Sequence, residues 1–221
     1  MRRCLDLPVC LLAVGIAGAA GAQGFDPSRV YLKGFGGVEF AQGTTAHSDY
    51  EPADLSYKFD YDTGYLFGAA VGYLATDRMA VELEYAWRRA DATVNGRYED
   101  HFSGVPFVDE WSFDDRVTVQ SGMANALYRF AAVGPGGRVT PYVGAGIGVA
   151  SLDVRGAGRA DPAFAWQAIG GVAWAIDPRW SLTGELRWFS TEGGDFFEAE
   201  NESIDMGFDA LDVIVGASYR F

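Results

Sequence analysis

Residues 211–221 read Leu-Asp-Val-Ile-Val-Gly-Ala-Ser-Tyr-Arg-Phe, and their side chains alternate in character along the segment. One set of alternate positions holds Leu211, Val213, Val215, Ala217, Tyr219 and Phe221, and the other holds Asp212, Ile214, Gly216, Ser218 and Arg220. Successive side chains of a β-strand point to opposite faces of the sheet, so a period of two predicts a strand with one apolar and one mixed face.

Seven earlier runs follow the same alternation. Counted from the N-terminus, the first, fourth and fifth do so less sharply. They are Val30–Phe40, Gly64–Tyr73, Met79–Arg88, Val117–Phe130, Tyr142–Ala150, Trp166–Ile176 and Trp180–Phe189. Short turns at residues 75–78, 134–137 and 177–179 alternate with long loops near 41–62, 89–116, 152–163 and 190–209. An even number of strands with short turns at one end and long loops at the other is typical of an up-and-down transmembrane barrel. We therefore predict an all-β fold, an eight-stranded antiparallel β-barrel formed by residues 23–221 as one domain.

The more polar face of these strands carries charged residues in mid-strand, and a membrane barrel would turn this face inward. We predict an interior charge network with five residues of each sign: Lys33, Arg88, Arg129, Arg187 and Arg220 against Glu39, Glu82, Glu84, Glu185 and Asp212. Burial of so many charges is costly unless they pair, so mutual salt bridges are expected. In the alternative arrangement these residues face water and the aromatic side chains form a soluble core.

Aromatic residues favour the membrane alternative, because several recur on one face at an interval of eight residues, as Trp166 and Trp174 do. Eight residues span roughly 26 Å along a strand. In a strand tilted from the membrane normal, this length covers a height close to the ~25 Å apolar band of outer-membrane barrels. We predict two aromatic girdles at the membrane interfaces. The predicted girdle residues are Tyr65, Tyr73, Trp87, Trp166, Trp174, Trp180, Trp188, Tyr219 and Phe221.

The N-terminal segment has the pattern of a secretory signal peptide. Arg2 and Arg3 precede an apolar stretch, and Ala20-Gly21-Ala22 resembles a cleavage site, so residues 1–22 are expected to be removed. Both cysteines, Cys4 and Cys10, lie within this segment, and export would leave a chain without thiol chemistry. We expect localisation to the cell outer membrane.

The whole chain is acidic, with 17 basic and 30 acidic residues and a formal net charge of −13. Such a charge excludes nucleic-acid phosphates as a natural partner. The aromatic content of 14% is too high for a disordered acidic chain. The four predicted loops hold 21 of the acidic residues and only six basic ones, so the acidity belongs to the loop end of the barrel.

Residues 125–130, Asn-Ala-Leu-Tyr-Arg-Phe, a Gly-rich turn and then residues 141–148, Pro-Tyr-Val-Gly-Ala-Gly-Ile-Gly, resemble strands four and five of the OmpA-like and Opa-like outer-membrane β-barrel superfamily. This superfamily includes the porin-family surface antigens common in alphaproteobacteria. Phe221, at the end of an alternating strand, is similar to the terminal signature that the outer-membrane assembly machinery recognises. The resemblance implies a non-catalytic role in envelope structure, adhesion or antigenic exposure, without cofactors, and a monomer embedded in outer-membrane lipid and lipopolysaccharide, with host or surface ligands reached through the loops. The chain ends at the barrel, so the resemblance does not extend to a peptidoglycan-binding domain.

Other functions rest on weaker signals. A small-solute porin is the main alternative, although eight strands leave little lumen beyond the side chains. A soluble periplasmic barrel and a lipid A-modifying enzyme are further alternatives, the latter with His47 and His101 as candidate bases. Acidic loop residues, such as Asp109 with Glu110 and Asp114 with Asp115, could bind divalent cations weakly, but no spacing is that of a calcium loop. No catalytic, cofactor or metal residue is assigned.

Overall fold

The computed structural model describes residues 26–42, 44–48, 53–100, 107–154, 158–159, 162–199 and 202–221. Side chains are described for residues 26–42, 62–93, 95, 112, 114, 116–153, 162–192 and 208–221. The N-terminal segment and its expected cleavage site therefore lie outside the described residues.

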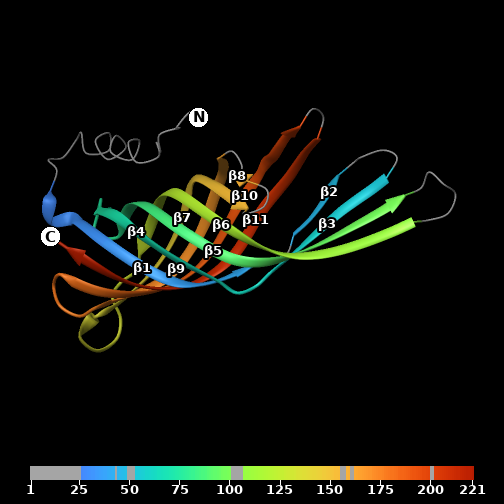
Figure 1. Cartoon of the computed structure of the whole chain (residues 1–221). Coiled ribbons are helices and arrows are strands. Elements are labelled where there is room, and N and C mark those ends of the chain that lie inside the picture. Colours follow the sequence, from blue (N-terminus) through green and yellow to red (C-terminus); the bar gives the residue numbers. More distant parts are fainter. Residues whose placement is uncertain are drawn as a thin grey trace, which may run out of the picture.

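The described chain consists almost entirely of β-strands, with two short 3-10 turns (Figure 1). In chain order the elements are η1 Pro27–Arg29, β1 Val30–Ala41, β2 Thr44–Ser48, β3 Ala53–Tyr61, β4 Gly64–Leu74, β5 Met79–Asp100, β6 Phe107–Arg129, η2 Pro135–Gly137, β7 Val139–Val154, β8 Gly158–Arg159, β9 Ala163–Ala175, β10 Trp180–Ala199 and β11 Glu202–Arg220. No helix in the described part of the chain has the length and apolar character needed to cross a membrane.

Eight strands form a closed antiparallel barrel, which confirms the predicted fold. Their order around the wall is β4–β1–β11–β10–β9–β7–β6–β5, and the pairing of β5 with β4 closes the ring. The first and last strands of the wall pair over eleven positions, from Tyr31 opposite Arg220 to Ala41 opposite Ala210. Closure removes the open sheet edges that would otherwise be left without backbone partners.

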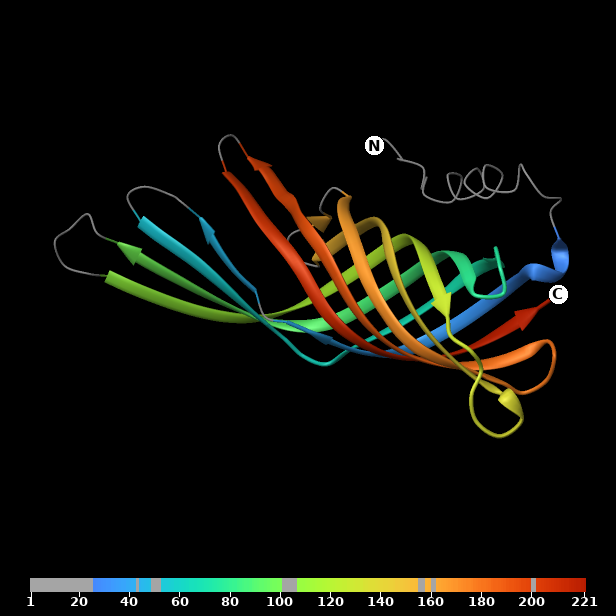
Figure 2. The same cartoon turned by 180° about the vertical axis from the view of Figure 1, so that it is seen from behind.

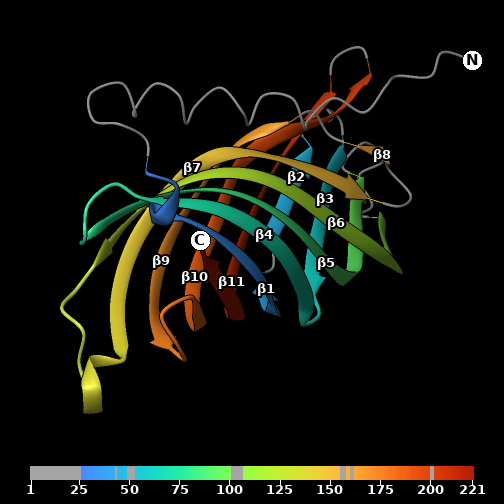
Figure 3. The same ribbon diagram turned by 90° about the vertical axis from the view of Figure 1, so that its left-hand side faces the viewer.

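The two ends of the barrel are built differently (Figures 1 and 2). At the turn end, β4–β5, β6–β7 and β9–β10 are joined by residues 75–78, 130–138 and 176–179, and Figure 3 views the barrel from this end. In the last of these turns, Asp177 Oδ1 accepts hydrogen bonds from the backbone N–H groups of Arg179 and Trp180 at 2.8 Å each. The bonds from Trp180 and Arg179 lower the pKa of Asp177 below its usual range, so this carboxylate stays ionised.

At the hairpin end the strands run further than the sequence predicts. Residues 89–116 and 190–209 are not simple loops, because β5 and β6 stay paired from Arg89 opposite Thr118 as far as Asp100 opposite Phe107. The β10–β11 pairing likewise continues to Ala199 opposite Glu202. The alternation fades here because a strand pair beyond the barrel has no lipid-facing side, although the backbone pairing persists. Figures 1 and 2 show the β5–β6 hairpin, with β2 and β3 beside it, extending beyond the barrel wall.

The wall has an apolar outer face and an inner face of buried side chains. Ile147, Val215 and Leu186 are among the most exposed apolar residues, at 61%, 70% and 57%. Residues on the other face of the wall, such as Gln167, Arg187 and Asp212, are completely buried. The structure therefore excludes the soluble arrangement in which the aromatic side chains form the core, and orients the fourth strand as predicted, with Asn125 inside and Tyr128 outside.

Candidate functional site: the filled lumen

The middle of the lumen holds a cluster of five charged side chains, here called the five-charge cluster: Lys33, Glu82, Glu84, Glu185 and Arg187. Lys33 Nζ lies 2.7 Å from Glu82 Oε2 and 3.2 Å from Glu185 Oε1. Arg187 Nη1 lies 2.7 Å from Glu84 Oε1, and Arg187 Nη2 lies 2.5 Å from Glu185 Oε2. Since β5 and β10 occupy opposite positions in the ring, the Arg187–Glu84 pair spans the lumen.

A second ionic cluster lies around Arg88. Its Nε is 3.2 Å from Glu39 Oε2, its Nη2 is 3.2 Å from Asp212 Oδ2, and its Nη1 donates to Ser121 Oγ at 2.8 Å. Glu39 and Asp212 face each other directly across the β1–β11 pair, so a single guanidinium serves two carboxylates. The ring of Phe189 packs on this guanidinium, with its centroid 4.0 Å from the Arg88 carbon.

Amide and aromatic side chains complete the polar layer. Gln167 Nε2 donates to Asn125 Oδ1 at 2.7 Å, and Asn125 Nδ2 donates to Glu84 at 3.2 Å. Arg187 stacks over Phe35 at 4.7 Å. Asn125 thus supplies a hydrogen-bond donor to a buried carboxylate, and partners of this kind are the condition under which buried charges are tolerated.

Two tyrosines close the cluster toward the turn end. The hydroxyl of Tyr31 donates to Glu82 at 2.8 Å, and that of Tyr142 donates to Glu185 at 2.5 Å. Each ring lies over a glycine directly across the sheet, Tyr31 over Gly72 and Tyr142 over Gly171. A Cβ at Gly171 would come within 2.7 Å of the Tyr142 ring, and one at Gly72 would overlap the Tyr31 ring. These two glycines are therefore required for the tyrosines to lie flat across the lumen.

Toward the hairpin end the lumen is filled by apolar side chains. Phe189 and Phe208 meet edge to face with centroids 6.4 Å apart. The remaining members of this apolar plug are Ala92, Val117, Val119, Met123, Ala150, Leu152, Ala165 and Ala210. The described lumen is thus closed in two successive layers, one ionic and one apolar.

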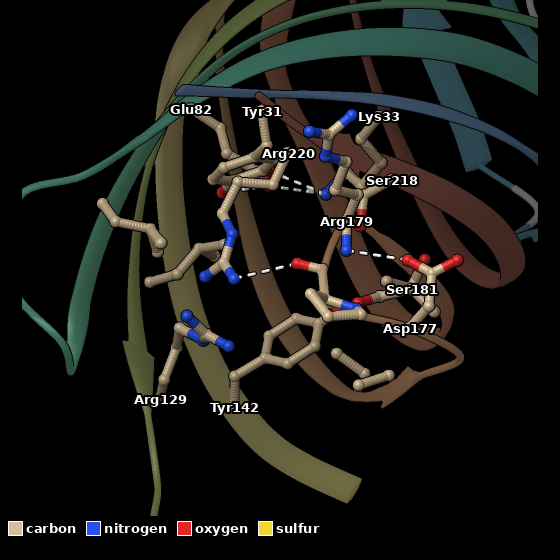
Figure 4. A pocket seen from close by; sticks show the side chains of 16 residues that line it. Tyr31, Lys33, Glu82, Arg129, Tyr142, Asp177, Arg179, Ser181, Ser218 and Arg220 are labelled. Atoms are coloured by element: carbon tan, nitrogen blue, oxygen red, sulfur yellow. Dashed lines mark hydrogen bonds and ion pairs between the residues drawn. The ribbon is translucent and has the colours of Figure 1, made fainter. Parts of the chain in front are cut away.

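At the turn end the lumen opens into a pocket of about 210 Å³, here called the mouth pocket (Figure 4). Its floor contains Tyr31, Lys33, Glu82 and Tyr142, and its apolar wall is made of Leu74, Leu127, Ala173 and Ala175. Three arginines, Arg129, Arg179 and Arg220, lie at its rim together with Asp177, and the hydroxyl residues Ser181, Thr183 and Ser218 also line it.

The structure separates the ten residues of the predicted charge network into two groups. Eight are buried and lie in the two ionic clusters: Lys33, Glu39, Glu82, Glu84, Arg88, Glu185, Arg187 and Asp212. Arg129 and Arg220 occupy the last inward positions of β6 and β11 and line the mouth pocket instead. The predicted balance of five against five therefore does not hold within the buried layer, where three basic residues face five acidic ones.

Several partners were missing from the predicted network. Tyr31, Tyr142, Asn125, Gln167 and Ser121 share the inward face with the charged residues, and all bond to them or to one another. The alternation of the strands could have identified these residues, because a polar side chain on the inward face needs a partner inside the lumen.

The predicted girdle residues all lie on the outer face, five of them exposed and Tyr73, Trp87, Trp188 and Tyr219 half-buried. They also contact one another: Tyr65 and Trp87 have centroids 5.7 Å apart, and Trp180 and Tyr219 are 5.0 Å apart. Tyr219 packs in turn on Phe221 at 5.3 Å. Trp180 and Tyr219 belong to the turn end and Tyr65 and Trp87 to the opposite end, so aromatic residues border the apolar wall on both sides.

The side chains of His47 and His101 lie outside the described residues, as do those of Asp109, Glu110 and Asp115. Among the described side chains, no group of three or more His, Cys, Asp or Glu residues is arranged to hold a metal ion.

The chain matches, over residues 9–221, the protein family described as outer membrane protein beta-barrel domain. Two solved structures share its fold: Neisserial surface protein A (16% identity, 87% of this chain and 97% of that one, TM-score 0.50) and the outer membrane protein OprG from Pseudomonas aeruginosa (11%, 87% and 95%, TM-score 0.50).

Among curated proteins, an uncharacterised protein of Brucella abortus strain 2308 is 33% identical over 139 residues, which cover 54% of this chain and 47% of the relative. A protein of Brucella suis biovar 1, also uncharacterised, is 32% identical over the same length and shares. The chain thus spans about half the length of the curated relatives it matches.

Proposed function

The chain belongs to the family of outer membrane protein β-barrel domains, and from this premise we propose that it is a non-catalytic outer-membrane protein with a structural, surface-exposed role of the adhesin or antigen kind. The observation that carries this proposal is the filled lumen. The two ionic clusters and the apolar plug occupy the space through which a solute would pass. Contacts with molecules outside the cell would therefore be made by the hairpin end.

The short turns face the periplasm in this account, and the long hairpins face the outside, as is usual for barrels of this class. The length of the β5–β6 hairpin supports a role in surface contact, because paired strands present a large and ordered backbone surface beyond the membrane. Two cross-strand contacts at its base, Arg116–Asp91 at 3.1 Å and Thr93–Asp114 at 3.2 Å, join directly opposed residues. The high acidity of residues 89–116 and 190–209 gives this end an anionic character.

The outer wall would contact membrane lipid and lipopolysaccharide through its exposed apolar residues, between the two aromatic girdles. Export would use residues 1–22 as a signal peptide, and the C-terminal strand ending in Phe221 would be recognised by the outer-membrane assembly machinery. The expected monomer is consistent with a barrel that satisfies its own strand edges.

An epitope test follows from this orientation. A short peptide epitope inserted between β5 and β6, within residues 101–106, should bind antibody on intact cells. The same epitope inserted at Gly136, in the β6–β7 turn, should bind antibody only after the outer membrane has been permeabilised. The measurement is antibody binding to whole cells by flow cytometry, and the expected difference is at least tenfold.

Both variants must first show heat-modifiable mobility on gels, which reports a folded barrel. Equal labelling at the two sites on intact cells, or labelling of the Gly136 epitope alone, would contradict the proposed orientation. Failure of both epitopes to label intact cells would contradict surface exposure.

A further inference from the structure

The rim of the mouth pocket contains more positive than negative charge. The pocket lining includes four cations, Lys33, Arg129, Arg179 and Arg220, and two anions, Glu82 and Asp177. Both anions are already engaged: Glu82 by Lys33 at 2.7 Å and by Tyr31, and Asp177 by two backbone N–H groups. Lys33 is itself shared between Glu82 and Glu185, so the surplus belongs to the rim. There three arginines face Asp177 and leave a formal surplus of two positive charges, at the end of the barrel opposite the acidic hairpins.

The arginines of this rim keep donors available. Among the described side chains, the guanidinium of Arg129 has no ion-pair or hydrogen-bond partner. That of Arg220 donates to the carbonyl of Pro178 at 2.9 Å, and that of Arg179 to the hydroxyl of Tyr219 at 3.4 Å. Neither bond neutralises the charge. Since β6 and β11 occupy opposite positions in the ring, Arg129 and Arg220 approach the pocket from opposite walls.

Three hydroxyl residues line the same pocket, although the oxygen of Thr183 is buried beside Gly216. Thr183, which lines the pocket, is 9% exposed, and its Oγ1 has no hydrogen-bond partner among the described residues. Ser181 and Ser218 add two more hydroxyls to the lining. The hydroxyls of Ser181 and Ser218 can donate hydrogen bonds to an oxygen-rich ligand.

We propose that the mouth pocket binds a small organic phosphate monoester. The planar fork of arginine matches the oxygens of a phosphate group, and a dianion would balance the surplus of two charges. The hydroxyl groups can bond to the remaining oxygens, and Leu74, Leu127 and Ala173 offer an apolar surface to a short carbon skeleton. The volume of about 210 Å³ restricts the ligand to a small molecule.

The test uses the full chain refolded in a maltoside detergent, which carries no phosphate. Glycerol 3-phosphate is titrated by calorimetry at low ionic strength, with glycerol as the neutral comparison. We expect saturable binding of glycerol 3-phosphate and none of glycerol. Arg129→Gln should weaken this binding about tenfold or more, the loss expected for one charge-assisted hydrogen bond. Because Arg129 has no described partner, the variant should remain folded.

Arg138→Gln is the matched control, since Arg138 is exposed at the same end and does not line the pocket. It should leave binding within twofold of wild type. A second variant, Ser218→Ala, removes a hydroxyl of the lining without changing charge and should also weaken binding. Absence of saturable binding in wild type would overturn the proposal. An equal loss in Arg129→Gln and Arg138→Gln would do so too, because it would indicate general attraction to the turn end.

Discussion

Replacing Arg187 with methionine should lower the free energy of unfolding by about 3–5 kcal/mol, the usual cost of breaking a buried ion pair. The side chain is completely buried, and it contacts Glu84 and Glu185 at 2.7 and 2.5 Å. Methionine fills similar space but leaves Glu84 without a cation in the lumen and Glu185 with Lys33 alone. Unfolding by urea in lipid vesicles, followed by tryptophan fluorescence, measures the loss.

The same substitution at an exposed pair is the control for Arg187→Met. Arg116→Met removes the contact with Asp91, whose side chain is 64% exposed, and should cost about 0–1 kcal/mol. Adding Glu84→Gln to the Arg187 variant should recover much of the lost stability, because the unpaired charge disappears. If Arg187→Met and Arg116→Met cost the same, the buried network does not hold the barrel together.

A charge on the outer wall should also be strongly destabilising. Val215 is 70% exposed and lies directly opposite Gly184, which is midway between the girdle residues Trp180 and Trp188 of β10. Val215→Arg should lower the free energy of unfolding in lipid vesicles by about 2–4 kcal/mol, the cost of arginine at the bilayer midplane of a barrel. Urea titration of the refolded variant in vesicles tests this directly.

Val133→Arg is the comparison for this variant, because Val133 is 51% exposed but lies in the β6–β7 turn, beyond the wall. Its effect should stay within about 0.5 kcal/mol, as for ordinary surface substitutions. A neutral Val215→Arg would mean that the apolar wall does not contact lipid.

The sequence was sufficient to predict which face of each strand is buried. Alternation alone separates Val213 from Asp212 and Leu186 from Arg187, because the side-chain period of a strand is fixed by its backbone. The aromatic spacing and the alternation of short and long connections then decided the number of strands and the membrane orientation of the two faces.

The contacts inside the lumen could not be predicted in the same way. Lys33 and Glu185 are 152 positions apart, and which carboxylate each cation meets depends on the stagger of the strands around the ring. Arg129 and Arg220 share the inward face of the network, yet they lie at the open end, because parity does not report depth along the barrel. The strand ends that extend past the apolar plug were missed for a related reason: a strand pair without a lipid-facing side has no apolar period to read.

Single-channel recording in planar lipid bilayers tests the central claim most directly, with a general porin as the positive control. If the ionic clusters and the apolar plug around Phe189 and Phe208 close the lumen, the refolded chain should insert without producing conductance steps. Large, stable channels from the wild-type chain would contradict the closed barrel and favour a role in solute passage.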